Sequence, residues 1–231
     1  MSLIVRLATA LLALTAAPLP AQDWDYGQRN TPHLAPAFPA QTRAAKLDAG
    51  PALEVETVVA GLDHPWGIAV LPEGGYLVTE RSGALRLVSA EGTVGAPIAG
   101  VPAVFAMRQG GLLDVALAAD FATSRRVWLS YAKPVGAALS ATAAGYGTLN
   151  ADATRLEGFT EVFVQHPASP TPAHYGSRVV PSGDHVFITS GEHFTPRERQ
   201  FAQDPAIPYG KVIRLMADGS VPPDNPFAGR G

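Results

Sequence analysis

The sequence contains no cysteine among its 231 residues. This absence excludes disulfide bonds, thiolate metal sites and cysteine nucleophiles. Charged residues are also scarce, at 16%, and the net charge of −3 leaves no excess of positive charge. Nucleic acid is therefore a poor expected partner. With 47% hydrophobic residues, the chain is instead apolar enough to fold around a core.

Long hydrophobic runs are missing as well, apart from one at the amino terminus that extends from Leu7 to Ala17 after Arg6. This run is shorter than the ~20 residues that cross a bilayer. A basic residue, a short apolar run and a small residue such as Ala21 are typical of a secretory signal peptide. We therefore predict a signal peptide over 1–21, a periplasmic or secreted bacterial protein, and no membrane span after its removal.

Residues 22–52 contain several prolines and almost no apolar periodicity. This composition predicts an extended linker or an arm on the surface of a domain. From Leu53 the pattern changes to alternating Val and Leu, which marks the start of a domain over 53–231.

Within that domain, short apolar stretches alternate with turns that contain Gly or Pro. The 23 Gly and 21 Pro residues make up nearly a fifth of the chain, against a typical ~12%. We predict antiparallel strands at Gly67–Leu71, Tyr76–Glu80 and Leu85–Ser89, and similar strand–turn–strand units at 110–132, 176–192 and 210–226, the last around the Asp218-Gly219 turn.

Two other segments are expected to be loops. The Ala- and Gly-rich residues 133–158 favour a loop over a helix, because each Gly would cost a helix about 1 kcal/mol. The charged stretch 197–200 reads as a solvated loop.

The strand–turn units recur every 40–60 residues or so, a spacing that favours the blades of a β-propeller. A β-sandwich is the alternative, since it also uses short strands at regular spacing. Residues 53–231 hold material for about three or four blades, and a ring needs at least about four to close. We therefore expect an incomplete array.

Three polar residues lie where such units would bring them to one rim. His174 follows a Pro-rich loop and precedes a strand, and an imidazole can accept a proton near pH 7. Glu192 follows the neighbouring strand and could orient that imidazole. Gln109 precedes a Gly-Gly turn and could donate to a carbonyl-rich ligand. Each residue also has an alternative interpretation: His174 as a structural histidine, Glu192 as a solvated loop acid, and Gln109 as a polar turn residue.

Four stretches, at 62–88, 108–121, 173–192 and 210–227, resemble in order the glucose/sorbosone dehydrogenase family of soluble quinoprotein sugar dehydrogenases. The resemblance implies an all-β, six-bladed β-propeller, of which this chain covers roughly the first half. It also implies pyrroloquinoline quinone (PQQ) and Ca²⁺ as cofactors, an aldose sugar as substrate and an electron acceptor as partner.

By the same resemblance, His174 is the general base that takes the sugar hydroxyl proton while hydride passes to the quinone. Glu192 supports this base, and Gln109 contacts the quinone. The family's later segments, which supply the calcium ligands and further basic groups, have no counterpart in this chain, so no metal ligand is assigned. The implied reaction is oxidation of an aldose to its lactone, and these residues alone are expected to be inactive.

Two further functions remain open on this scaffold, because fold does not determine function. One is a non-redox propeller that binds carbohydrate or a protein partner. The other is a calcium-dependent lactone hydrolase that acts without quinone.

Overall fold

The computed structural model describes residues 33–35, 37–38 and 50–227, which form eleven β-strands and two short helices. The chain divides into two units, residues 1–54 and 55–231. The predicted signal peptide and most of the predicted linker lie outside the described residues. Within the described part, no helix is long and apolar enough to cross a membrane. All of the strands and helices in the described residues belong to the second unit.

The first sheet contains β1 (Pro65–Val70), β2 (Tyr76–Glu80), β3 (Leu85–Val88) and β4 (Val94–Pro97), in that order and antiparallel. The three predicted strands at the start of the domain are confirmed to within two residues at their ends. Gly74 and Gly75 have φ of +99° and +80°, which explains why the turn between β1 and β2 requires glycine. Residues 53–62 form no strand, in spite of their alternating pattern.

The second sheet contains β5 (Leu112–Leu117), β6 (Arg126–Val135), β7 (Leu139–Leu149) and β8 (Leu156–Val164), again antiparallel and in chain order. A four-residue helix, α1 (Phe121–Ser124), connects β5 to β6. The prediction of a loop over 133–158 is therefore wrong. Glycine is required at 145 and 147 because β8 lies close to β7. A Cβ would lie 2.3 Å from the Thr160 carbonyl oxygen at position 145 and 2.6 Å from Leu156 Cγ at position 147.

The third sheet contains β9 (Gly176–Ser182), β10 (His185–Ser190) and β11 (Lys211–Met216), with β10 in the middle. The Asp218-Gly219 turn forms, but of the predicted hairpin only the strand before it is present in the described chain. The predicted loop at 197–200 is instead part of a short helix, α2 (Pro196–Phe201). Thr195 caps this helix and Pro196 begins it, a combination that favours a helix start.

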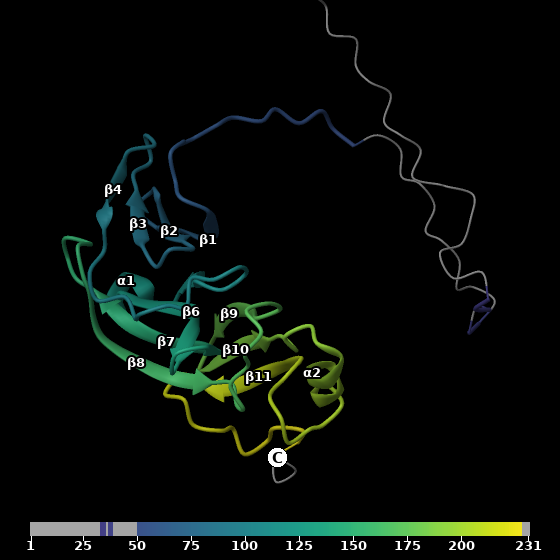
Figure 1. Cartoon of the computed structure of the whole chain (residues 1–231). Helices are drawn as coiled ribbons and strands as arrows, with labels where there is room; N and C mark the ends of the chain where they lie inside the picture. The colour runs from purple at the N-terminus through teal and green to yellow at the C-terminus, as the bar shows by residue number, and fades with distance from the viewer. Residues whose placement is uncertain (1–32, 36, 39–49, 228–231) are drawn as a thin grey trace, which may run out of the picture. The chain divides into compact units, whose positions relative to one another are not determined.

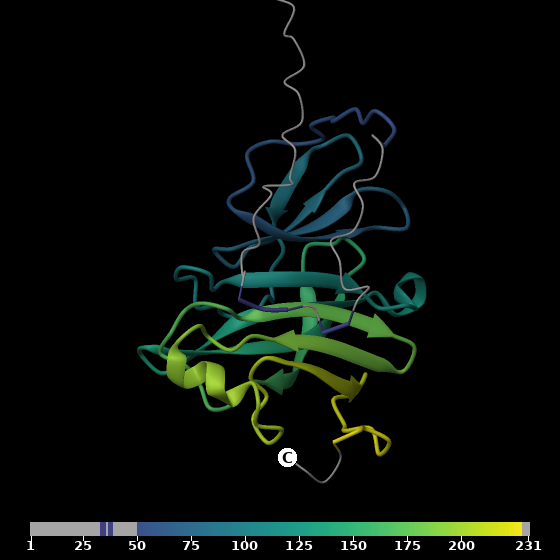
Figure 2. The same cartoon turned by 90° about the vertical axis from the view of Figure 1, so that its right-hand side faces the viewer.

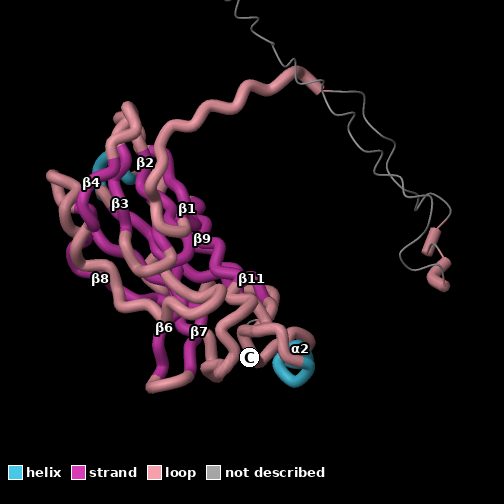
Figure 3. The backbone as a smooth tube through the Cα atoms, turned by 45° about the horizontal axis from the view of Figure 1, so that its top comes forward, coloured by secondary structure: helices cyan, strands magenta, loops and turns pink. Residues whose placement is uncertain are grey.

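The three sheets lie one after another in chain order and do not stack face to face as two layers (Figures 1 and 2). The first strand of each sheet contacts the first strand of the next, because β1 packs against β5 and β5 packs against β9. Figure 3 shows that strands make up nearly all of the regular structure, with the helices at the periphery. This succession of sheets is the arrangement of propeller blades, and it excludes the two-layer β-sandwich.

A repeated hydroxyl contact connects consecutive sheets. Thr79 Oγ1 in β2 accepts a hydrogen bond from Gly67 N (2.8 Å) and donates to the carbonyl oxygen of Leu113 in the next sheet (2.5 Å). Ser130 in β6 does the same one sheet later: it accepts from Asp114 N (3.0 Å) and donates to the carbonyl of Ser177. The hydroxyl in the second strand of a sheet thus joins its own first strand to the first strand of the next sheet.

We expect Ser130→Ala to lower the free energy of unfolding by about 1–3 kcal/mol, because it leaves a buried N–H and a buried carbonyl without their partner. Urea unfolding followed by tryptophan fluorescence measures the effect. Ser182→Ala, at an exposed position, is the control and should change the stability by less than about 0.5 kcal/mol. Equal stability of the two variants would show that the inter-sheet contact is not stabilising.

Candidate active site

His174 lies in the segment that leads into β9, at one end of the third sheet. Its backbone has φ of +49°, a conformation that is uncommon for residues other than glycine. The backbone N–H donates to Gln109 Oε1 (2.8 Å), and the ring Nδ1 lies 2.8 Å from Glu192 Oε1. The structure therefore brings the three predicted site residues together, with His174 between the other two.

Glu192 reaches His174 because β9 and β10 are antiparallel. Ser190 at the end of β10 pairs with Gly176 at the start of β9, so the residues just beyond β10 return to the residues just before β9. Gly191 makes this approach possible: its N–H donates to the Tyr175 carbonyl (2.9 Å), and a Cβ at this position would lie only 1.6 Å from the His174 carbonyl oxygen.

Gln109 is held by a reciprocal pair of hydrogen bonds with the segment before β9. Its N–H donates to the Pro172 carbonyl (3.2 Å), and its side-chain oxygen accepts from His174 N. The following Gly110 and Gly111 allow close packing, since a Cβ on either would lie within 2.4 Å of a carbonyl oxygen. Arg81 binds the same turn by donating from Nη1 to the Arg108 carbonyl (2.8 Å).

The charge on Glu192 determines which way the His174 hydrogen bond runs. Burial favours a higher pKa for Glu192, but the hydrogen bond with His174, the residue's own backbone N–H and the nearby Arg199 together outweigh burial and lower the pKa. Arg199 Nε lies 3.7 Å from the carboxylate oxygen. An ionised Glu192 can only accept, so His174 donates from Nδ1–H and its Nε2 lone pair is left available to accept a proton.

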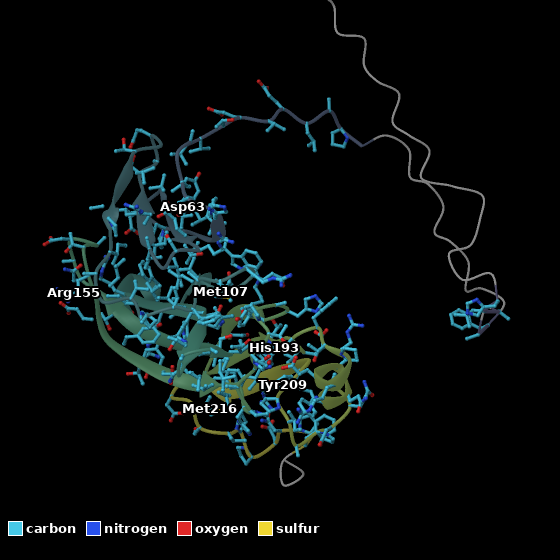
Figure 4. All side chains as sticks on the ribbon, in the orientation of Figure 1. Asp63, Met107, Arg155, His193, Tyr209 and Met216 are labelled. Carbon is cyan, nitrogen blue, oxygen red and sulfur yellow. The ribbon has the colours of Figure 1, made fainter. Side chains whose placement is uncertain are left out.

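A second histidine, His193, directly follows Glu192 and is fully buried. Its Nδ1 is 3.0 Å from the Thr171 carbonyl and its Nε2 is 2.6 Å from Gln165 Oε1. Figure 4 shows His193 beside Tyr209 in the interior, where the two ring centroids are 5.2 Å apart. His193 therefore has a structural role: it fixes the loop that carries Glu192 to the segment before His174.

Burial also affects the tyrosines of this region, and it raises the pKa of Tyr209 to about 12. Tyr175, which packs on His193, has a raised pKa for the same reason. A tyrosine with a higher pKa in the folded protein stabilises the fold while it is protonated, and this contribution is lost as the pH rises from about 10 towards the folded value.

We therefore expect the thermal unfolding midpoint to fall steeply above about pH 10, with up to about 2–3 kcal/mol lost through Tyr209 by pH 12. Calorimetry between pH 8 and 12, with tyrosinate absorbance recorded in parallel, checks this. Tyr209→Phe should be less stable at pH 8, because it loses the hydrogen bond to the Pro167 carbonyl, but its midpoint should fall less steeply with pH. Parallel curves for the two proteins would contradict the expectation.

Sequence reasoning missed three residues next to the site: Gln165, Phe194 and Arg199. Gln165 bridges the sheets by donating to Ser190 Oγ and the Gly191 carbonyl, both at 2.8 Å, and no local pattern indicates this. Phe194 and Arg199 lie beside the His174–Glu192 pair because α2 follows the loop at once. The cap at Thr195 with Pro196 was the available signal for that helix.

The donors around His174 suit an anionic ligand that is rich in carbonyl groups, as PQQ is. Among the residues that the structure describes, the Gln109 amide NH₂ has no hydrogen-bond partner and can donate to such a ligand, whereas His174 Nε2 is left without a partner as an acceptor. The guanidinium groups of Arg81 and Arg199 contact the same loops. Within residues 33–35, 37–38 and 50–227 there is no group of three or more His, Asp or Glu side chains that could hold a metal ion.

Comparison with known proteins identifies the family of the chain. The family model described as glucose/sorbosone dehydrogenase matches residues 62–231. Aldose sugar dehydrogenase YliI of Escherichia coli K12 is 45% identical over 187 residues, which cover 80% of this chain and 50% of that protein. An uncharacterized Synechocystis protein, slr1608, is 34% identical over 251 residues, and the match covers 97% of this chain and 57% of that protein.

Solved structures give the same result. The apo form of the E. coli soluble aldose sugar dehydrogenase superposes with a TM-score of 0.71 and 45% identity, covering 75% of this chain and 50% of that one. The PQQ-bound aldose sugar dehydrogenase of Streptomyces coelicolor superposes with a TM-score of 0.65 and 28% identity, covering 76% and 51%. The present chain spans about half the length of these relatives. Its fold is the all-β propeller fold predicted from the sequence, and the chain belongs to the glucose/sorbosone dehydrogenase family.

Proposed function

We propose that the intact protein oxidises an aldose sugar to its lactone in a PQQ-dependent reaction, and that His174 is the general base. The observation that carries the proposal is the short contact between His174 Nδ1 and an ionised Glu192, which leaves Nε2 available as a proton acceptor beside the Gln109 amide. The family and the PQQ-bound relative support the substrate class and the cofactor.

In this proposal each residue has a separate task. His174 Nε2 accepts the proton of the sugar hydroxyl, and Glu192 stabilises the resulting imidazolium and keeps its ring oriented. Gln109 donates its free amide N–H to a carbonyl or carboxylate of the cofactor. When bound, PQQ supplies an acceptor for the hydride that leaves the sugar carbon.

The location and partners follow from the same proposal. We propose that the protein acts in the periplasm or outside the cell, after removal of a signal peptide, and that it passes electrons to a separate acceptor. Ca²⁺ is expected as a second cofactor from the family resemblance.

The test is reconstitution of the intact protein, prepared without cofactor, with PQQ and Ca²⁺ in the presence of an aldose and a redox dye. We expect dye reduction and lactone formation only when PQQ is present. Lactone hydrolysis by the quinone-free protein would favour the hydrolase alternative. Sugar binding without dye reduction would favour a carbohydrate-binding module.

A further inference from the structure

Phe194 is an apolar ring at the surface, two residues after Glu192. Its side chain is 53% exposed, whereas the preceding His193 is fully buried. Its backbone has φ of +77°, a conformation that strains a bulky residue. Such strain persists only where the surroundings enforce it, and it concentrates at functional sites.

Both neighbours of Phe194 hold it in this strained position. His193 is fixed in the interior by its contacts to Thr171 and Gln165. Thr195 is the N-cap of α2: its Oγ1 accepts from Glu198 N (3.2 Å) and donates to Glu198 Oε2 (2.7 Å). The ring is therefore presented to solvent from a loop whose flanking residues are both held by hydrogen bonds.

The ring lies directly against the proposed base. Its centroid is 5.0 Å from that of His174 in an edge-to-face arrangement, and the Arg199 guanidinium lies 4.7 Å from the Phe194 centroid. Arg199 also approaches Glu192, so one cation contacts both the ring and the carboxylate that orients the base. The fold thus keeps an exposed aromatic ring beside the imidazole of His174.

Building on the proposed function, we propose that Phe194 is the surface on which the C–H face of the sugar ring rests during oxidation. A pyranose has apolar patches of C–H groups that pack on an aromatic ring, while its hydroxyls need polar partners. Phe194 supplies the apolar contact beside His174, which takes the hydroxyl proton. Phe194 is accordingly a positioning residue for the substrate, and Arg199 holds its ring in place.

Phe194→Gly separates this role from a structural one. Glycine adopts positive φ without strain, so the variant should unfold at the same temperature as the wild type or higher. At the same time, we expect KM for the aldose to rise about 5–20-fold, because one aromatic contact with the substrate is lost. The change in kcat should be smaller, and the affinity for PQQ should be unchanged. Phe194→Tyr, which keeps the ring, should retain a KM within about threefold of the wild type.

Phe227→Ala is the matched control. This residue is also an exposed phenylalanine (58%), but it follows the segment that binds Arg214 in β11, and its variant should keep the wild-type KM. An unchanged KM in Phe194→Gly, or a loss of PQQ affinity in place of sugar affinity, would overturn the inference. Failure of the proposed function is distinguishable, because then the wild type itself shows no quinone-dependent oxidation.

Discussion

Replacing His174 with glutamine is expected to reduce the rate of aldose oxidation by about 10²–10⁴-fold, the usual contribution of a positioned general base. Glutamine can still donate to Glu192 from its amide, so the local hydrogen bond is retained, but it offers no group that accepts a proton at neutral pH. The measurement is dye-linked turnover at saturating sugar, together with PQQ affinity by fluorescence titration. PQQ affinity should stay close to the wild-type value.

Glu192→Gln is the companion variant. It removes the charge that makes His174 donate from Nδ1, so the rate should fall, but by less than in His174→Gln because the imidazole remains. If His174→Gln turned over at the wild-type rate, His174 would not be the base. If it lost PQQ and activity together, His174 would be a cofactor-binding residue instead.

Replacing Gly191 with alanine should be the most disruptive single change in the described chain near the site. The new Cβ would lie 1.6 Å from the His174 carbonyl oxygen and 2.4 Å from the His174 carbonyl carbon, and both are backbone atoms that cannot rotate away. The loop after β10 must therefore separate from the segment before β9. We expect a loss of about 3 kcal/mol or more in stability, in the range of severe core substitutions, and loss of the His174–Glu192 contact.

Urea unfolding measures the first effect, and the histidine NMR signals report the second. Gly95→Ala in β4 is the control, because its Cβ would have its closest contact at 3.1 Å, to the Leu87 carbonyl oxygen. That variant should lose only a small part of the stability. A Gly191→Ala protein as stable as Gly95→Ala would mean that the two segments are not as close as the structure has them.

Strands β1 to β3 and β9 to β11 could be predicted because each is bounded by Gly or Pro at a turn, a local signal, whereas β4 was not predicted. The loop predicted over 133–158 was wrong because a glycine can mark close packing between strands as well as flexibility. Gly145 and Gly147 lie where β8 leaves no room for a side chain, and this depends on residues at 156–160 that no local pattern identifies.

The candidate site likewise contains residues that the sequence predicts and residues that it does not. His174, Glu192 and Gln109 could be predicted from their positions next to strands and from the family resemblance, and the structure places them in contact. Their support could not be predicted. Gln165 bonds to Ser190 and His193, 25 and 28 residues away, and such contacts follow from the tertiary fold alone.

The most direct test of the proposed reaction compares an aldose carrying hydrogen at C1 with one carrying deuterium there, using the intact protein with PQQ and Ca²⁺. Removal of this hydrogen by His174-assisted oxidation predicts slower dye reduction with the deuterated sugar, lactone as the product, and almost no turnover in His174→Gln. Equal rates for both sugars in single-turnover experiments, or lactone formation that neither PQQ nor the imidazole influences, would contradict it.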